Sequence, residues 1–259
     1  MLDYFNLCRT LGKHITPPGG VDLFLAFIHS EYIAESSRKF RYLDIASNSG
    51  IVSRELAKFN LHDRIECIDI NDTVVDWGNQ LCEEEGLSNI SFKCINAYEV
   101  PYLKHSFDIV NLGVSLGFFL KHRSVVLNNI RKVLRPDGIV FVNNLYYKSE
   151  PPLELVRSVQ SILGTDIVNP EKMNYEFHLS YLSELFELKS EILVSYEGRQ
   201  SKSDHYHYIK DYCSKNKSMV IEFDDQERES LYHEYARQRE ILNENDLYCG
   251  SAIQAWTVK

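Results

Sequence analysis

The sequence predicts an α/β protein built on a parallel, doubly wound sheet. Short apolar segments alternate with amphipathic ones through the first 145 residues. The apolar segments are almost continuously hydrophobic, as expected for strands that helices cover on both faces of the sheet. Crossovers between parallel strands are right-handed almost without exception, which favours the doubly wound topology.

Each segment has a local signal for its predicted element. The breaker "TPPGG" opens the first helix, Ile51, Leu56 and Phe59 share one face of the second, and Gly86 ends the third. Strands are predicted at residues 40–46, 64–70, 90–96, 107–114 and 139–144. Helices are predicted at residues 21–35, 50–59, 71–87 and around Val125, Val126, Ile130, Val133 and Leu134, stopping at "RPDG".

The second half of the chain has a different character. The pattern of residues 183–198 predicts a helix that runs into a sixth strand. Residues 201–219 are polar and rich in Tyr and His. Residues 224–242 predict a long amphipathic helix. The imperfect alternation of residues 247–259 predicts a final strand. We expect a cap embedded in the same domain rather than a second domain.

Composition excludes several classes of function. The net charge of −9 over 259 residues argues against a protein that binds duplex nucleic acid, which usually has a basic surface. The six cysteines are scattered without a C-x-x-C pair, so we expect no metal site and reduced thiols. The amino terminus lacks a signal-peptide pattern, and the most apolar stretch, "IVNLGVSLGFFL", is too short to cross a bilayer. We therefore expect a cytoplasmic protein without a membrane partner.

The stretch "RYLDIASNSG" (41–50) indicates a ligand site. Its strand ends in Asp44, and small residues follow up to the predicted helix, so that a ligand can approach the backbone at a helix amino terminus. Asn48 is one of the few non-glycine residues that tolerates a left-handed conformation. The second strand also ends in a carboxylate, Asp69, placed to accept hydrogen bonds from ribose hydroxyls. A cationic amino acid joined to a nucleoside fits both acids, and S-adenosylmethionine is such a molecule.

Four motifs in this order resemble those of the class I S-adenosylmethionine-dependent methyltransferases, in particular their small-molecule branch. They are "YLDIASNSG", "ECIDIN", "CINAYEVPYLKHSFDIV" and "VVLNNIRKVLRPDGIVFV", and they lie within residues 17–145. The resemblance implies a Rossmann-like, seven-stranded sheet with the last strand antiparallel. It also implies one domain made of a helical lid (1–40), a cofactor-binding core (41–145), a sixth strand with a helical cap (146–247) and a final strand (248–259).

The resemblance also implies a cofactor site. Asp44 would lie near the methionine amino end, Asp69 would bind the ribose, and Ile70 would pack against the adenine. Asn96 takes the place of the usual adenine-binding Asp, and Ala46 and Asn48 stand where the family has glycines. The full predicted set is Tyr4, Asp44, Ala46, Ser47, Asn48, Gly50, Asp69, Ile70, Asn96, Ala97 and Leu112.

Candidates for acid–base chemistry and acceptor binding come from the second half and the amino terminus. His178 is the first candidate for a general base and His14 the second, because the pKa of histidine lies near neutrality. Tyr175, His178 and Tyr181 fall near one helical face. The predicted acceptor contacts are Asn144, Tyr146, Tyr175 and His205.

We expect S-adenosylmethionine-dependent methylation of an O or N atom of a small molecule, without a metal, in a chain that could form a homodimer. Three alternatives stay open: a non-catalytic S-adenosylmethionine-binding or interaction protein of the same fold, a methyltransferase acting on RNA or protein, and a nicotinamide oxidoreductase. The sequence lacks the G-x-G-x-x-G fingerprint that the oxidoreductase would need. The departures at Ala46 and Asn48 motivate the non-catalytic alternative.

Overall fold

The computed structural model describes residues 2–34, 39–119, 121–165, 168–194, 202–216 and 223–259. The chain forms two compact units. The sheet unit comprises residues 16–146, 174–194 and 251–259, and the helical unit comprises residues 1–15, 147–173 and 195–250. Residues 1–15 of the predicted lid therefore belong to the helical unit, whereas the rest of the described lid belongs to the sheet unit. The single-domain organisation stays a prediction.

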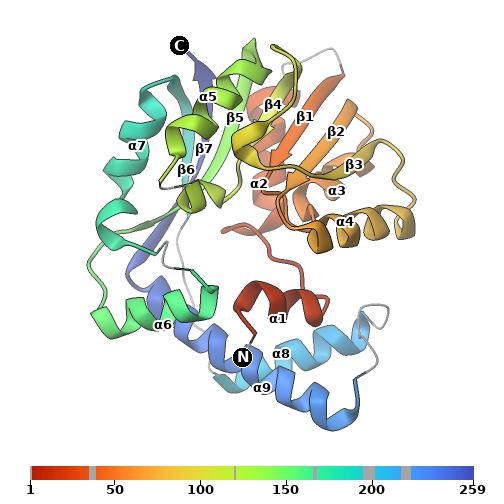
Figure 1. Ribbon diagram of the computed structural model, residues 1–259, viewed down its shortest axis with the longest axis vertical. Helices are drawn as coiled ribbons and strands as arrows, with labels where there is room; N and C mark the ends of the chain where they lie inside the picture. The colour runs from red at the N-terminus through yellow and green to blue at the C-terminus, as the bar shows by residue number, and fades with distance from the viewer. Residues whose placement is uncertain (1, 35–38, 120, 166–167, 195–201, 217–222) are drawn as a thin grey trace. The chain divides into compact units, whose positions relative to one another are not determined.

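The sheet has seven strands in the order β3-β2-β1-β4-β5-β7-β6 (Figure 1). The pairs β1–β2, β1–β4, β2–β3 and β4–β5 are parallel, and β6–β7 is antiparallel. The predicted doubly wound sheet with an antiparallel last strand is confirmed. The strands are β1 (Phe40–Ile45), β2 (His62–Asp69), β3 (Ile90–Cys94), β4 (Phe107–Asn111), β5 (Leu134–Tyr147), β6 (Phe186–Val194) and β7 (Cys249–Val258).

The helices of the sheet unit follow the predicted alternation. They are α2 (Gly20–Ile28), α3 (Ile51–Lys58), α4 (Asp72–Glu84), α5 (Arg123–Val133) and α7 (Tyr175–Ser183). A π-helical turn, η1 (His29–Ile33), continues α2, and 3-10 turns form η2 (Ala97–Glu99) and η3 (Ser115–Phe119). Asn71 caps α4 by accepting a hydrogen bond from the Val74 amide, which fixes where that helix starts after β2.

Two local predictions were wrong. The helix predicted at the start of residues 183–198 is not present there: Ser183 is the last residue of α7 and the strand begins at Phe186. Residues 195–198 lie outside the described residues. The turn predicted at "RPDG" is instead an irregular part of β5. Helix α5 ends at Val133, Leu134 pairs with Phe107 and Ile139 with Ile109, so the residues between them bulge out of the ladder. Gly138 lies inside this strand, where an added Cβ would come 2.8 Å from the Asp108 carbonyl oxygen. The close backbone approach explains the glycine without a turn.

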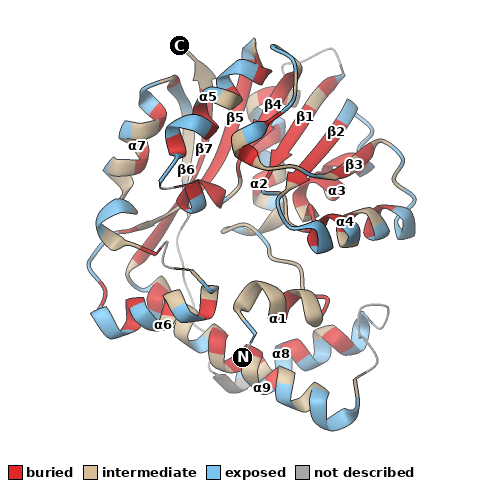
Figure 2. Ribbon diagram, in the orientation of Figure 1, coloured by how far each residue is buried: buried red, intermediate tan, exposed pale blue. Residues whose placement is uncertain are grey.

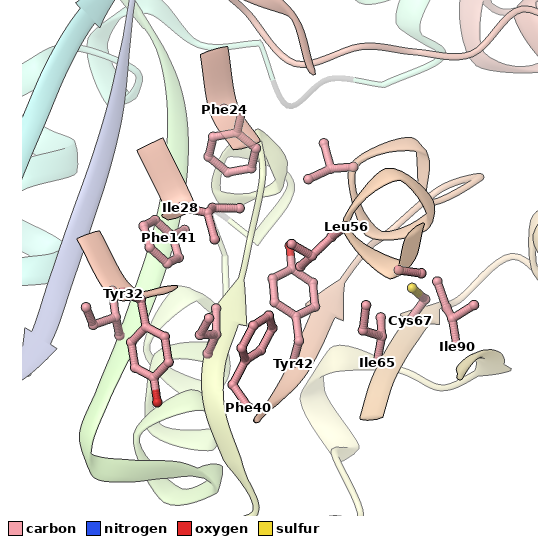
Figure 3. Close-up of a cluster of buried hydrophobic side chains, with 14 of the residues drawn as sticks. Phe24, Ile28, Tyr32, Phe40, Tyr42, Leu56, Ile65, Cys67, Ile90 and Phe141 are labelled. Atoms are coloured by element: carbon pink, nitrogen blue, oxygen red, sulfur yellow. The ribbon is translucent and has the colours of Figure 1, made fainter. Parts of the chain in front are cut away.

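Strand side chains divide between two hydrophobic cores, one on each face of the sheet. On one face, Phe40, Tyr42, Ile109 and Phe141 pack with residues of α2, α3 and α4. Figure 3 shows this cluster, in which the rings of Phe24 and Phe141 meet edge to face at 6.4 Å. The other face uses the intervening strand residues and packs against α5 and α7; its strand residues include Leu43, Ile45, Ile68, Val110, Val140, Val142 and Trp256. The central strands are therefore buried on both faces, as Figure 2 shows.

The helical unit contains α1 (Tyr4–Thr10), α6 (Leu153–Leu163), η4 (Pro170–Lys172), α8 (Lys202–Lys215) and α9 (Asp225–Asp246). The prediction for residues 224–242 anticipated α9, whereas α6 was missed. Asp224 and Glu227 form a capping box that starts α9. Helices α1, α8 and α9, with Leu11 directly after α1, share a core of buried side chains: Leu7, Cys8, Leu11, Ile209, Cys213, Tyr232 and Tyr235. None of the helices in the described part of the chain is both long and apolar enough to cross a lipid bilayer.

Gly78 provides a test of the packing between α4 and β3. Inside a helix, Gly→Ala normally stabilises by about 0.5–1 kcal/mol. At Gly78, however, an added Cβ would come 2.6 Å from the Phe92 ring. We expect Gly78→Ala to lower the free energy of unfolding by about 1–3 kcal/mol, because overpacking outweighs helix propensity. Urea denaturation measures this change.

Two further variants make this test specific. Phe92→Leu should reduce the cost of Gly78→Ala in a double-mutant cycle, because the clashing ring is gone. Glu83→Ala, at an exposed position of the same helix, should change the free energy of unfolding by less than about 0.5 kcal/mol. Stabilisation by Gly78→Ala would show that helix propensity decides at this position.

Candidate cofactor and acceptor site

The loop between β1 and α3 has an alternating left-handed backbone. Ala46, Asn48 and Gly50 have φ angles of 54°, 51° and 63°. Glycine adopts this conformation without strain, asparagine tolerates it, and alanine is disfavoured by about 1–2 kcal/mol. At Gly50 a side chain is also excluded sterically, since its Cβ would come 2.3 Å from the Phe92 ring. The chain thus keeps the loop conformation of a glycine-rich turn although two of the expected glycines are replaced.

Asp44 lies at the carboxyl end of β1, at the switch point between the neighbouring strands β1 and β4. Its side chain is 4% exposed. One carboxylate oxygen accepts a short hydrogen bond from the Ser53 hydroxyl of α3, and the other accepts from Asn111 Nδ2 of β4 at 2.8 Å. Burial raises the pKa of Asp44 to about 7, although both hydrogen bonds oppose this rise. The carboxylate therefore titrates near neutral pH in the absence of a cation.

Ser53 and Asn111 were missed by the sequence reasoning. Asn111 pairs in register with Asp44 across the parallel β1–β4 ladder, so the two side chains emerge at the same level of neighbouring strands. The predicted fourth strand contained this residue, but its pairing with β1 had to be known before the contact could be inferred. The helical position of Ser53 was likewise predicted, without a signal that it faces the strand end.

Asp69 at the end of β2 ties the left-handed loop to the neighbouring strand. One of its oxygens accepts from the Asn48 amide and the other from the Asn71 amide, both at 3.0 Å. A carboxylate has about four lone-pair sites, so two remain for further donors. Ile70, the next residue, is 70% exposed. An acceptor pair and an apolar side chain therefore lie next to each other, which suits a ribose with its attached base.

The remaining predicted cofactor contacts are held mainly through the backbone. The Ser47 amide donates to the Ile68 carbonyl at 3.0 Å. Asn96 Oδ1 accepts from the Tyr98 amide at 3.0 Å and caps η2. The Ala97 carbonyl accepts from Asn129 Nδ2 at 3.0 Å. The side chain of Leu112 is buried in the core that includes α5. Leu112 and Ala97 thus have core side chains, and their predicted contacts with the cofactor stay predictions.

Three predicted acceptor contacts join one polar network in the sheet unit. The Tyr146 and Tyr175 rings lie 5.0 Å apart, and the Tyr175 hydroxyl contacts Glu191 Oε1 and Oε2 at 2.9 and 2.8 Å. Gln254 Nε2 donates to Glu191 at 2.6 Å, and Asn144 Nδ2 donates to Gln254 Oε1 at 2.8 Å. Burial and the hydrogen bond to Glu191 raise the pKa of Tyr175. This phenol is therefore a neutral group at physiological pH.

Glu191 and Gln254 were not predicted as part of this network. They stand opposite each other in the antiparallel β6–β7 ladder. A carboxylate or amide on a strand usually indicates a solvent-facing position, so the sequence offered no signal for them. Only the pairing of β6 with β7 reveals that they meet Tyr175 of α7.

His178, the first candidate base, lies in α7 and is 1% exposed. Burial lowers its pKa to about 4, and the nearby Arg123 charge acts in the same direction. The imidazole is therefore neutral at physiological pH, but it is a weak base. His178 could accept a proton only from a group of comparably low pKa without a large free-energy cost.

The other three predicted residues belong to the helical unit, and their roles stay predictions. The Tyr4 ring stacks on Tyr235 at a centroid distance of 6.0 Å, and burial raises its pKa. His205 is buried, with its Nε2 at 2.6 Å from Asn243 Nδ2. His14 is partly exposed, and its carbonyl accepts from Lys13 Nζ at 2.9 Å. Within the described ranges, no group of three or more His, Cys, Asp or Glu side chains is arranged to hold a metal ion.

Comparison with known proteins gives a consistent result. Residues 43–142 match the family model described as a methyltransferase domain. A curated relative, the ubiquinone/menaquinone biosynthesis C-methyltransferase UbiE of Shewanella frigidimarina, is 28% identical over 145 residues, which are 54% of this chain and 55% of that protein. The corresponding protein of Ectopseudomonas mendocina is 27% identical over 123 residues, or 47% of this chain and 48% of that protein. The chain thus spans about half the length of the curated relatives that it matches.

Solved structures share the fold over nearly the whole chain. The MccD protein has a TM-score of 0.75 at 23% identity, covering 95% of this chain and all of that one. A methyltransferase of Geobacter sulfurreducens in complex with S-adenosyl-L-homocysteine has a TM-score of 0.65 at 17% identity, with complete coverage of both chains. The [4+2]-cyclase SpnF has a TM-score of 0.71 at 17% identity and covers 98% of this chain and 92% of that one. At these identities the likeness shows the fold.

The motifs, the sheet topology, the acidic strand ends and the family model lead to one conclusion. Residues 43–142 match a methyltransferase domain, and the chain has the fold of S-adenosylmethionine-dependent methyltransferases.

Proposed function

We propose that this protein methylates a small-molecule acceptor at an oxygen or nitrogen atom. S-adenosylmethionine, when bound, supplies the methyl group, which the acceptor takes up by in-line displacement as S-adenosylhomocysteine leaves. The observation that carries this proposal is the pair of carboxylates at the ends of neighbouring strands. Asp44 is buried at the switch point, and Asp69 retains acceptor sites beside the exposed Ile70.

The residues of the sheet unit have distinct roles in this proposal. Asp44 attracts the cationic amino acid end of the cofactor, because a buried carboxylate with a raised pKa is stabilised by a neighbouring positive charge. Asp69 accepts from ribose hydroxyls, and Ile70 covers the adenine. The backbone of the loop from Ala46 to Gly50 lines the bound cofactor. Asn96 and Ala97 contact the adenine edge, and Leu112 borders the methionine moiety.

The acceptor would lie beside the network that links Asn144, Tyr146 and Tyr175. Aligning a nucleophile with the methyl carbon is the main catalytic contribution in such transfers, and positioning of this kind can supply several kcal/mol. A base is needed only where the acceptor atom keeps its proton. The low pKa of His178 makes it suited to an acidic acceptor, while His14, His205 and Tyr4 remain proposed contributors from the helical unit.

A carbon acceptor is the second candidate. The curated relatives are named C-methyltransferases, and this name favours a carbon nucleophile over the heteroatoms that we predict from the sequence. Transfer of an isotope-labelled methyl group, followed by NMR of the product, would distinguish carbon-bound from heteroatom-bound methyl. We further propose a cytoplasmic location and a homodimer, with neither nucleic acid nor membrane as partner.

Calorimetric titration with S-adenosylmethionine tests cofactor binding. We expect saturable heat with the wild-type chain and weaker binding for Asp69→Asn, by about 1–3 kcal/mol. The loss is expected because hydrogen bonds to a charged acceptor are stronger than those to an amide.

The matched control is Asp76→Asn, an exposed position on the following helix, which should leave the affinity unchanged. Absence of heat with the wild-type chain would contradict the proposed function. Equal affinity of wild type and Asp69→Asn would remove Asp69 from the site.

The pH dependence of cofactor affinity tests Asp44. Because the pKa of the carboxyl group is about 7 in the free protein, protonation below that value removes its negative charge. Affinity for the cationic cofactor should therefore rise as pH increases, by about tenfold between roughly pH 6 and pH 8, and then level off.

Asp44→Asn should bind more weakly at the upper pH and lose this dependence, which separates Asp44 from the titration of the ligand itself. An unchanged pH profile in the variant would contradict the assignment of Asp44 as the group that meets the positive charge.

A further inference from the structure

Arg123 is a buried cation whose hydrogen-bonding capacity is unused within the described part of the chain. It is the first residue of α5 and is 1% exposed. Within the described residues, its Nε, Nη1 and Nη2 atoms have no hydrogen-bond partner. Burial lowers the pKa of Arg123 to about 10, so the group is charged at neutral pH. A buried charge without an acceptor is strongly unfavourable, so such a group calls for a partner.

Two aromatic rings of α7 account for part of its environment. The guanidinium carbon lies 5.0 Å from the Phe177 ring centroid and 4.7 Å from that of Tyr181. Cation–π contacts engage the flat faces of the guanidinium, whereas its N–H donors point outward in its plane. The rings therefore stabilise the charge but accept none of its hydrogen bonds. No acceptor among the described residues lies in hydrogen-bonding position to the guanidinium.

His178 adds a second unused polar group next to the first. It lies between Phe177 and Tyr181 in sequence, and the Arg123 charge acts on its ring. Within the described part of the chain, neither of its ring nitrogens makes a hydrogen bond of good geometry, and the Leu145 backbone is a polar group that lies against the ring. Because the imidazole is neutral at physiological pH, one of these nitrogens carries a hydrogen and can donate. Buried polar groups nearly always have partners, so the unpaired guanidinium of Arg123, with this imidazole close to it, points to a ligand.

Arg123 and His178 lie on the side of the sheet where we propose that the acceptor binds. The first turn of α5 lies on the side of the sheet where the parallel strands end, because α5 follows β4 in the chain. His178 lies beside the backbone of Leu145, near the carboxyl end of β5. Leu145 stands between Asn144 and Tyr146, the proposed acceptor contacts.

We infer that Arg123 and His178 bind an oxyanion, a carboxylate or phosphate group carried by the small-molecule acceptor. This inference rests on the proposed function for the identity of the ligand as the acceptor. A guanidinium offers a planar fork that matches two oxygens of either group, and the imidazole N–H supplies a further donor. The half-buried rings of Phe177 and Tyr181 border the guanidinium, and they must shift for the anion to reach it. The site thus selects for an acidic acceptor.

Titration of the full chain with sodium phosphate and with sodium acetate, each against sodium chloride at matched ionic strength, tests this inference without cofactor. Thermal denaturation and calorimetry give the readouts, because a ligand that binds the native state raises its stability. We expect saturable binding of at least one of the two anions. Arg123→Met should weaken this binding at least tenfold, and Arg123→Lys should recover part of it because the charge returns without the fork.

Arg131→Met is the matched control, since Arg131 is exposed on the same helix. It should keep wild-type anion affinity. His178→Phe should weaken anion binding, because phenylalanine fills the same space with an aromatic ring but has no ring nitrogen to donate. Absence of saturable binding to the wild-type chain, or equal affinity of wild type and Arg123→Met, would overturn the inference and leave Arg123 as a packing residue.

The same wild-type sample separates this inference from the proposed function. Its titration with S-adenosylmethionine decides whether the cofactor binds, and its titrations with phosphate and acetate decide whether the anion binds. Saturable anion binding without cofactor binding would support the oxyanion site while the proposed methyl transfer fails. Cofactor binding without anion binding would overturn the oxyanion site and leave the proposed methyl transfer standing.

Discussion

The buried carboxylate of Asp44 is the constraint on which the candidate site depends. It lies where the strand order reverses, with hydrogen bonds from Ser53 on one side and Asn111 on the other. These two bonds orient the carboxylate but do not offset its desolvation, so its pKa is raised to about 7. A positive charge at this place would remove that cost. A cationic ligand beside Asp44, as we propose for the cofactor, would stabilise the ionised form of this carboxyl group.

The loop that follows Asp44 shows how a family motif can change in sequence and keep its shape. Ala46 and Asn48 adopt the left-handed backbone that glycine would adopt without strain. The amide of Asn48 is held by Asp69, so the acid at the end of β2 also fixes the loop after β1. Such a contact can offset part of the strain at the loop. The two acids are thus linked structurally as well as through their proposed ligand.

The opposite side of the proposed reaction is built mainly from elements that follow the motif region in the chain. Glu191 and Gln254 of β6 and β7 connect to Tyr175 at the start of α7, and the same helix places His178 close to Arg123. The fold alone does not decide the reaction, since its structural neighbours include a [4+2]-cyclase as well as methyltransferases. Side chains on α5 and α7 are therefore the features that would distinguish one acceptor from another.

The sequence by itself determined the order of the strands and helices, the doubly wound sheet and the two acidic strand ends. These features depend on local hydrophobic patterns and on short motifs, which can be recognised in a single sequence. The wrong turn at "RPDG" and the missed helix α6 have the same cause: their local signals were read without the contacts that override or stabilise them.

Only the tertiary structure decided which side chains meet. Asn111 joins Asp44 because β4 pairs beside β1, and Arg123 meets the rings of α7 across about fifty residues of chain. Burial likewise raises the pKa of Asp44 and lowers that of His178, and neither shift can be predicted from a sequence pattern. Contacts between distant segments and the loss of solvent are properties of the packed chain, and for that reason they had to be observed in the structure.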